Sequence, residues 1–167
     1  MKIKDSGTRR EFNTGAVRDI QEGKGRCDLM PLDVLSDIYK TEFGADDHST
    51  KVLYNLSLFT KSGLRLHLHN ALIEFYLESK YTNLPDMLLE LAKHFEEGAK
   101  KYGEHNWQKG IPAHCYIDSA VRHFLKLSRG DTDEPHDRAF VWNIICCIWT
   151  CKHKPELNDY AATRKEQ

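Results

Sequence analysis

Apolar residues recur at intervals of three and four along most of the chain, and this spacing constrains the fold more than any other feature of the sequence. Between Pro31 and Lys80 the pattern appears in three groups: Leu35, Ile38 and Tyr39; Leu53, Leu56 and Phe59; Leu72, Phe75 and Tyr76. Residues at this spacing lie on one face of an α-helix. We therefore predict two or three helices here, and because alternating strand patterns are nearly absent, the predicted fold class is all-α.

Three further helices are predicted over residues 85–103, 117–129 and about 133–151. A proline opens the first of them, and a glycine follows the second, as is typical of helix starts and stops. The stripe of the first consists of Leu88, Leu91, Ala92, Phe95, Ala99 and Tyr102. The sequence thus predicts a bundle of about five helices.

The length of 167 residues suits a single domain with four parts. Residues 1–30 hold four glycines and seven basic residues with few apolar positions, which predicts an extended basic arm. Residues 31–84 form a helical segment of unassigned role, residues 85–152 hold the candidate catalytic helices, and residues 153–167 form a polar tail.

Charge and hydropathy exclude several classes of partner. Lys and Arg number 24 against 25 Asp and Glu, so a net charge of −1 gives no global field for a nucleic-acid backbone or an anionic membrane. The longest apolar run, residues 139–151, is shorter than the roughly 20 residues of a membrane span. The N-terminus lacks the apolar segment of a secretory signal. The number of cysteines, five, is odd, which does not suit the paired disulfides of a secreted protein. We expect a cytoplasmic protein with neither nucleic acid nor membrane as partner.

Acidic residues gather where the last helix begins, at Asp131, Asp133, Glu134 and Asp137. On helical geometry Asp137 lies above the apolar face of that helix, with Glu134 near the same line. A wheel of the preceding helix centred on Phe95 places Glu96 at the edge of the buried face and Glu97 on the exposed side. Converging carboxylates are suited to Mg²⁺. The alternative is that these acids only complement the helix macrodipole.

Residues 97–112, EGAKKYGEHNWQKGIP, contain two candidate features. Lys100 and Lys101 follow Glu96 and Glu97 at i+4, a spacing typical of exposed ion pairs. Asn106 and Trp107 lie in a glycine-bounded loop, where they either read a nucleobase or close the end of the bundle.

The predicted helix 117–129 carries a second group of candidates. Asp118 and Arg122 are spaced for an exposed ion pair. His123 lies at the edge of the apolar stripe and is a candidate metal ligand, phosphate donor or boundary histidine. The cysteines of the last helix lack the paired spacing of a zinc site and are expected to be buried thiols.

Three blocks, taken in order, resemble a known family. They are REFNTGAVRDIQEGKGRCDLMP (residues 10–31), EGAKKYGEHNWQKGIP (97–112) and SAVRHFLKLSRGDTDEPHDRAFVWN (119–143). Together they are similar to the phage-type dATP/dGTP diphosphohydrolases, which are related to the MazG-like all-α NTP pyrophosphohydrolases. The resemblance implies hydrolysis of dGTP, dATP or both to the monophosphate and pyrophosphate by water that Mg²⁺ or Mn²⁺ activates.

The resemblance also implies a set of metal-binding acids. MazG-like enzymes hold their metal on an EExxE helix and an ExxD helix. Glu96 and Glu97 match the paired acids, and Glu134 and Asp137 match ExxD. Glu96, Glu134 and Asp137 are therefore the expected catalytic residues. Two departures are that Lys100 replaces the third glutamate and that Pro135 lies inside the second motif, so Asp133 or His136 could complete the metal site instead.

Substrate contacts are expected from basic, aromatic and amide side chains of three segments. They are Arg18 and Lys24; Lys100, Lys101, Tyr102, Asn106 and Trp107; and Arg122, His123 and Asn143. The basic residues would offset the charge of the triphosphate. The MazG-like resemblance further implies a homo-oligomer, a dimer or tetramer.

Three alternatives remain open at this point. One is a nucleotide-binding or sequestering protein without catalysis, and another is a purely structural helical protein. The third is an HD-type phosphohydrolase that uses His123, His136, Asp137 and Asp159 in that order.

Overall fold

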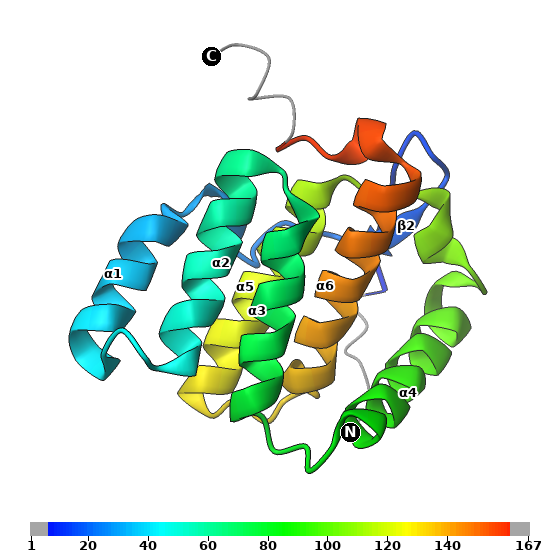
Figure 1. Cartoon of the computed structure of the whole chain (residues 1–167). Helices are drawn as coiled ribbons and strands as arrows, with labels where there is room; N and C mark the ends of the chain where they lie inside the picture. Colours follow the sequence, from blue (N-terminus) through cyan, green and yellow to red (C-terminus); the bar gives the residue numbers. More distant parts are fainter. Residues whose placement is uncertain (1–6, 161–167) are drawn as a thin grey trace.

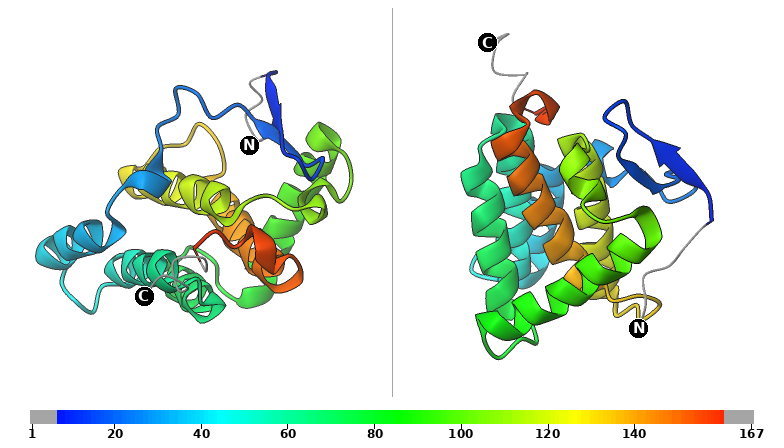
Figure 2. Two further views of the ribbon diagram at one scale, coloured as in Figure 1. Left: turned by 90° about the horizontal axis from the view of Figure 1, so that it is seen from above. Right: turned by 90° about the vertical axis from the view of Figure 1, so that its right-hand side faces the viewer.

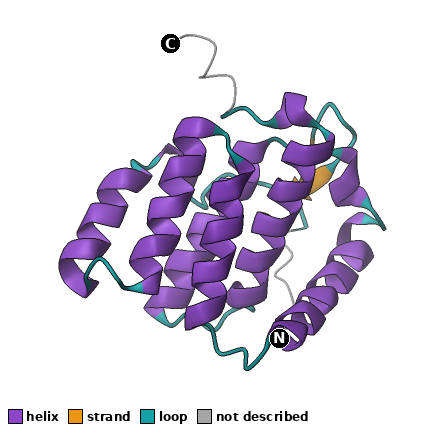
Figure 3. Ribbon diagram, in the orientation of Figure 1, coloured by secondary structure: helices purple, strands orange, loops and turns teal. Residues whose placement is uncertain are grey.

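Six α-helices account for most of residues 7–160, the part of the chain that the computed structural model describes (Figures 1 and 3). They are α1 (Leu32–Phe43), α2 (His48–Ser62), α3 (Arg65–Glu78), α4 (Leu84–Tyr102), α5 (Ala113–Arg129) and α6 (His136–His153). Three short 3-10 helices are added: η1 (Cys27–Leu29), η2 (Asn106–Lys109) and η3 (Pro155–Leu157). The predicted all-α class is confirmed. Among these residues no helix combines the length and apolarity that crossing a bilayer requires.

Local signals explain where the helices begin and end. Asp47 caps α2 by accepting a hydrogen bond from the Thr50 amide at 2.9 Å, and Asn83 caps α4 through the Asp86 amide at 3.0 Å. Gly130 ends α5 in the left-handed conformation, with φ of 84°. The start of α5 lies at Ala113, before the expected residue 117, because the buried face continues to the helix N-terminus.

The core lies around α6, which packs against α3, α4 and α5. In Figure 1, α2, α3, α5 and α6 run side by side, α1 lies beyond α2, and α4 crosses obliquely beside α6. Phe140 of α6 is fully buried and its ring centre lies 4.4 Å from that of Phe75 on α3. Because α6 is covered on several sides, its apolar residues occur around most of its circumference, as expected for a buried helix.

The arm, residues 7–30, folds back as a hairpin over the bundle instead of extending away from it. Strands β1 (Arg9–Glu11) and β2 (Val17–Asp19) pair antiparallel, and Figure 2 shows this hairpin on the side of α4 and α5. Asn106 holds β2 in place: its Oδ1 accepts from the Val17 amide and its Nδ2 donates to the Val17 carbonyl, both at 2.8 Å. Residues 1–6 of the predicted arm lie outside the described residues.

The predicted polar tail, residues 153–167, is described as far as residue 160. Its Asp159 accepts a hydrogen bond from the His114 amide at 3.1 Å and forms an ion pair with the His114 ring. This carboxylate raises the pKa of His114 to about 10, with the Cys115 thiol as a second cause. The first part of the tail is therefore attached to the N-terminus of α5. Residues 161–167 lie outside the described part.

Candidate functional site

A cavity of about 460 Å³, here called the arm cavity, lies between the arm and helices α4, α5 and α6. Eight of the residues expected to form the site line it: Arg18, Lys24, Tyr102, Asn106, Arg122, His123, Glu134 and Asn143. The three resembling sequence blocks each contribute part of this wall. Residues separated by more than a hundred positions are thus brought together, which local spacing alone does not reveal.

A larger cavity, of about 610 Å³, opens between the ends of α1, α3 and α5. Its walls are mostly apolar and include Phe43, Phe75 and Phe124. Asp137 is the one expected site residue among its lining residues. We take the arm cavity as the candidate site because eight expected site residues line it, against one in the larger cavity.

The arm cavity is positively charged. Five basic side chains line it (Arg10, Arg18, Lys24, Arg122 and Lys126), against two carboxylates (Asp19 and Glu134). Burial lowers the pKa of the Lys24 ammonium, an effect that Asp19 opposes and Arg122 reinforces. Burial also raises the pKa of the Tyr102 hydroxyl, and Asp19 adds to the increase. Such a cavity favours an anionic ligand over a neutral or cationic one.

Arg18 connects the arm to the floor of this cavity. Its Nη1 donates to the Cys115 carbonyl at 3.0 Å, and its Nη2 donates to Ser119 Oγ at 3.1 Å and to Asn143 Oδ1 at 2.8 Å. The guanidinium also lies over the Tyr116 ring, 5.3 Å from its centre. The arginine therefore fixes β2 against both α5 and α6.

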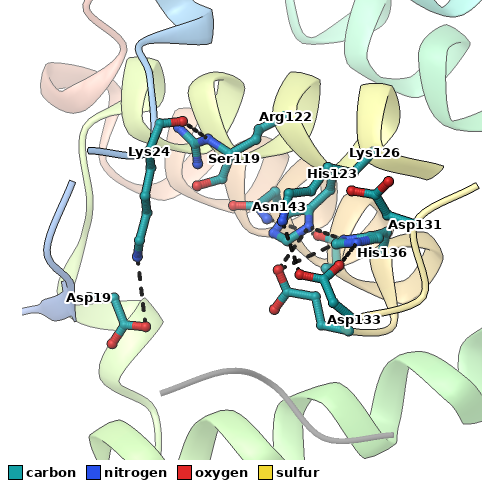
Figure 4. A network of polar contacts seen from close by, with 12 residues as sticks. Asp19, Lys24, Ser119, Arg122, His123, Lys126, Asp131, Asp133, His136 and Asn143 are labelled. Carbon is teal, nitrogen blue, oxygen red and sulfur yellow. Dashed lines mark hydrogen bonds and ion pairs between the residues drawn. The ribbon is translucent and has the colours of Figure 1, made fainter. Parts of the chain in front are cut away.

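Arg122 and Asp118 hold the second half of the arm. Arg122 Nε and Nη2 donate to the carbonyls of Lys24 and Gly25, at 3.0 and 3.1 Å, and Arg122 also pairs with Asp118. The predicted pair exists, but the expectation that it is exposed is wrong, because Asp118 is 1% exposed under the arm. Figure 4 shows Arg122 and Lys24 beside one another at this edge of the cavity.

The loop residues Asn106 and Trp107 are occupied by contacts within the chain. Both polar atoms of the Asn106 amide are bonded to Val17, as described above. The Trp107 ring lies 5.5 Å from Phe95 and 5.0 Å from Trp149, centre to centre. Of the two interpretations of this loop, closure of the bundle end is the one these contacts favour.

The helical wheel of α4 is wrong about the two glutamates. Glu96 is exposed, at 64% of its side chain, and pairs with Lys100, as the i+4 spacing predicts. Glu97 is the more buried of the two, at 24%, and bonds to Arg138 at 2.9 Å. The wheel was centred on apolar residues, whereas the buried face of α4 carries polar residues, His94 and Lys101, beside the apolar Met87 and Leu91.

Lys101 is likewise not an exposed partner of Glu97. Its side chain is 6% exposed and its Nζ lies 2.7 Å from Asp19 Oδ2. Lys24 approaches the same carboxylate, at 3.9 Å (Figure 4). Lys101 therefore acts on the cavity indirectly, because it holds Asp19, which lines the cavity.

The structure does not gather the expected acids into one cluster. Asp137 Oδ2 accepts a hydrogen bond from the Tyr81 hydroxyl and pairs with Lys80 Nζ, each at 2.7 Å. Burial raises the pKa of Asp137, but the hydrogen bonds from Lys80 and Tyr81 outweigh that effect, so its pKa is lowered overall. Glu96, Glu97 and Asp137 thus each have a cationic partner. These contacts do not bring the carboxylates of the MazG-like motifs together.

The HD-type alternative is also not supported by the contacts of its acids. Of its four residues, His123 and His136 meet, but Asp137 bonds to Lys80 and Tyr81, and Asp159 bonds to His114.

Groups of possible metal ligands occur at the start of α6, beside the arm cavity. One group comprises His123, Glu134 and His136, and a second comprises Asp131, Asp133 and His136. The Nδ1 atoms of His123 and His136 are 2.9 Å apart, and each lies 3.8 Å from Glu134 Oε1. Figure 4 shows the two rings facing one another, with Asp133 beside His136. Burial, followed by the charge of His136, lowers the pKa of His123 well below its usual value, so its ring is neutral at pH 7.

His94 of α4 is a cavity residue that the sequence analysis missed. Its ring centre lies 5.7 Å from that of Trp142, and its side chain is buried. Burial, followed by the charges of Arg138 and Arg18, lowers its pKa to about 3. The signal in the sequence was that His94 follows Met87 and Leu91 at helical spacing. Counting it with them would have corrected the buried face assigned to α4.

The low pKa of His94 predicts a loss of stability in acid. In the unfolded chain the ring takes up a proton below about pH 6.5, whereas in the folded chain it does so only near pH 3. The free energy of unfolding should therefore fall as pH drops through this window, by at most about 1.4 kcal/mol per pH unit from this group. In His94→Gln the decline, measured by urea unfolding at several pH values, should be shallower. The exposed His69→Gln is the control and should keep the native slope.

Comparison with known proteins gives one match. A family model described as dATP/dGTP diphosphohydrolase, N-terminal, matches residues 73–160, just over half of the chain. No curated protein and no solved structure matches. The matched segment contains α4, α5 and α6, which form three sides of the arm cavity, while the arm lies before it.

Proposed function

The chain belongs to the dATP/dGTP diphosphohydrolase family, and on that basis we propose that it hydrolyses a deoxynucleoside triphosphate, dGTP or dATP, to the monophosphate and pyrophosphate. The observation that carries the proposal is that eight expected site residues from the matched region and the arm line one positively charged cavity. A triphosphate is the type of ligand that such a charge distribution attracts.

The residues of the cavity supply the binding part of the reaction. Arg18 and Lys24 of the arm and Arg122 and Lys126 of α5 present cations to the phosphates, and preorganised cations of this kind stabilise the charge that develops in phosphoryl transfer. The hydroxyl of Tyr102, which is neutral because its pKa is raised, lines the same cavity and is a candidate contact for the sugar. Trp142, which also lines the cavity, is a candidate surface for stacking of the base.

The reaction is proposed to require a divalent cation, Mg²⁺ or Mn²⁺. When bound, such an ion supplies an activated water and polarises a phosphoryl oxygen. Within the described residues, two groups have donor atoms close enough together for one ion: His123, Glu134 and His136, and Asp131, Asp133 and His136. Glu96, Glu97 and Asp137 belong to neither group. Of the residues expected from the sequence to bind a metal, Glu134 and His136 belong to these groups.

Product analysis tests the proposed activity. The purified chain is incubated with each of the four deoxynucleoside triphosphates and Mg²⁺ or Mn²⁺, and the products are separated by ion-exchange chromatography. We expect equal amounts of monophosphate and pyrophosphate, with dGTP or dATP consumed fastest, and no reaction in excess chelator. Orthophosphate or tripolyphosphate release would contradict the proposal. Saturable binding without turnover would instead favour the nucleotide-binding alternative.

Two further properties are part of the proposal. Exposed apolar side chains on α4, namely Leu84, Leu88 and Leu89, support association of the chain with a second copy of itself, as a dimer or tetramer. Sedimentation velocity measures this directly, and a monomer at micromolar concentration would contradict it. All five cysteines are free, which is consistent with the proposed location in the cytoplasm, of the host cell if the protein is of phage origin.

A further inference from the structure

We propose that His123, Glu134 and His136 form a binding site for a first-row transition-metal dication, and that this site, not an all-carboxylate Mg²⁺ site, serves the arm cavity. The inference builds on the proposed function, because it names the cofactor class and its ligands. It differs from the family resemblance, which implies carboxylates of an EExxE and an ExxD motif.

The spacing of the three donor atoms fits one small cation. The two Nδ1 atoms are 2.9 Å apart, and each lies 3.8 Å from Glu134 Oε1. A point in their plane at equal distance from all three atoms is about 2.1 Å from each. Zn²⁺, for example, is bound by imidazole nitrogen and carboxylate oxygen at about 2.0 to 2.2 Å.

The tautomer of His136 is set for coordination through Nδ1. Its Nε2 lies 2.7 Å from Asp133 Oδ1, and because a carboxylate oxygen only accepts, Nε2 must carry the hydrogen. The Nδ1 lone pair then faces His123 Nδ1 (Figure 4). A carboxylate that bonds the remote nitrogen of a histidine is the usual support of a metal ligand. His136 is also fully buried at its side chain, which fixes the ring.

The second group of donors at this place, Asp131, Asp133 and His136, is less suited to a cation. Its Asp133 already accepts the hydrogen bond from Nε2 of His136. Both of its acids also have cationic partners: Asp133 lies 3.3 Å from Lys126 Nζ, and Asp131 pairs with Arg129. A metal bound there would have to displace Lys126 and Arg129 from these two ion pairs.

The donor set decides the class of ion. Mg²⁺ prefers oxygen ligands in octahedral geometry, whereas imidazole suits transition-metal dications such as Zn²⁺, Fe²⁺ and Ni²⁺. Mn²⁺ is the first-row dication closest to Mg²⁺ in its ligand preference, so it is the strictest probe of the difference. Two of the three donors here are imidazoles. Since His123 and Glu134 line the arm cavity, the remaining coordination positions of the ion would face the space in which a triphosphate fits.

Direct metal binding without nucleotide tests the inference. The full chain, freed of metal by chelation, is titrated with MnCl₂ and, separately, with MgCl₂ by isothermal titration calorimetry. We expect one Mn²⁺ per chain and at least tenfold weaker binding of Mg²⁺. His123→Asn and Glu134→Gln should each weaken Mn²⁺ binding at least tenfold, whereas the matched variant Asp131→Asn, three residues from Glu134, should leave it unchanged. Equal affinity for the two ions, or loss of binding only in Asp131→Asn, would overturn the inference.

A spectroscopic measurement on the unaltered chain covers the case in which a variant does not fold. Electron spin echo modulation of bound Mn²⁺ should show coupling to the ¹⁴N nuclei of two imidazoles, and its absence would identify an all-oxygen site. The outcomes separate the two proposals. If Mn²⁺ shows coupling to nitrogen but no triphosphate is hydrolysed, the metal site is supported and the proposed activity is contradicted. Hydrolysis in Mg²⁺ that His123→Asn leaves intact removes the metal site and keeps the activity.

Discussion

Replacing Arg18 with glutamine should lower the affinity of the chain for dGTP or dATP about 100-fold, which corresponds to about 2.7 kcal/mol. The guanidinium makes three hydrogen bonds, to the Cys115 carbonyl, Ser119 Oγ and Asn143 Oδ1, and hydrogen bonds of a charged donor are among the stronger ones. Its loss removes a cation from the cavity and detaches β2 from α5 and α6 at the same time. Equilibrium binding of a non-hydrolysable triphosphate analogue, measured by calorimetry, gives the affinity directly.

Two variants show whether the effect belongs to the cavity. Arg26→Gln removes the same group from the same arm, but Arg26 pairs with Asp28 and does not line the cavity, so its affinity should stay close to that of the native chain. Arg18→Lys keeps the charge without the planar fork and should fall between the two. If Arg18→Gln bound the analogue as tightly as Arg26→Gln does, the arm cavity would not be the nucleotide site.

Asp118→Asn should lower the free energy of unfolding by about 3 kcal/mol. The Asp118 carboxylate accepts hydrogen bonds from the Cys27 amide at 2.7 Å and from Gln21 Nε2 at 2.8 Å, and it pairs with Arg122. An asparagine keeps the shape of the side chain but loses the charge and one acceptor, so Arg122 is left without its carboxylate partner beneath the arm. Guanidinium unfolding, followed by circular dichroism, measures the change.

The matched control for this prediction is Asp33→Asn, which breaks the ion pair of Asp33 with Lys61 on the exposed side of α1 and should have little effect. Similar unfolding curves for Asp118→Asn and the native chain would show that the arm is held mainly by Arg18 and Asn106. In that case Asp118 would be a helix residue with no special part in fixing the arm.

The positions of the helices could be predicted from the sequence because each has strong local signals. Pro85 and Gly103 mark the two ends of α4, and Gly130 stops α5, so the expected and observed helices differ by a few residues. The start of α5 was placed late, since Ala113 and Cys115 are too small or too polar to extend an apolar stripe convincingly. The strands could not be predicted, because a three-residue strand has no periodicity of its own.

The faces of α4 were harder to predict, for a physical reason. A wheel assumes that the apolar side of a helix faces the core, but α4 turns His94 and Lys101 inward and leaves Leu88 and Leu89 exposed. Buried polar residues that line a cavity contradict the assumption at the place where function is expected. Glu96 and Glu97 were therefore assigned to the wrong sides of the helix.

The meeting of Arg18 with Asn143 could not be found by any local rule. These residues are 125 positions apart, and their hydrogen bond exists because the arm returns across α5 to reach α6. The resemblance did place both in the candidate site, without saying that they touch. The pairing of His123 with His136 through Nδ1 is of the same kind, since it depends on the angle at which α5 and α6 meet.

The arm lies outside the segment that the family model matches, yet it forms one whole side of the cavity. Residues 73–160 in isolation would therefore lack one side of this cavity. The arm is fastened to the bundle by a few residues, among them the buried Ala16 and the hydrogen-bonded Arg18. A substitution elsewhere in the arm can therefore change the wall of the cavity without altering the helices.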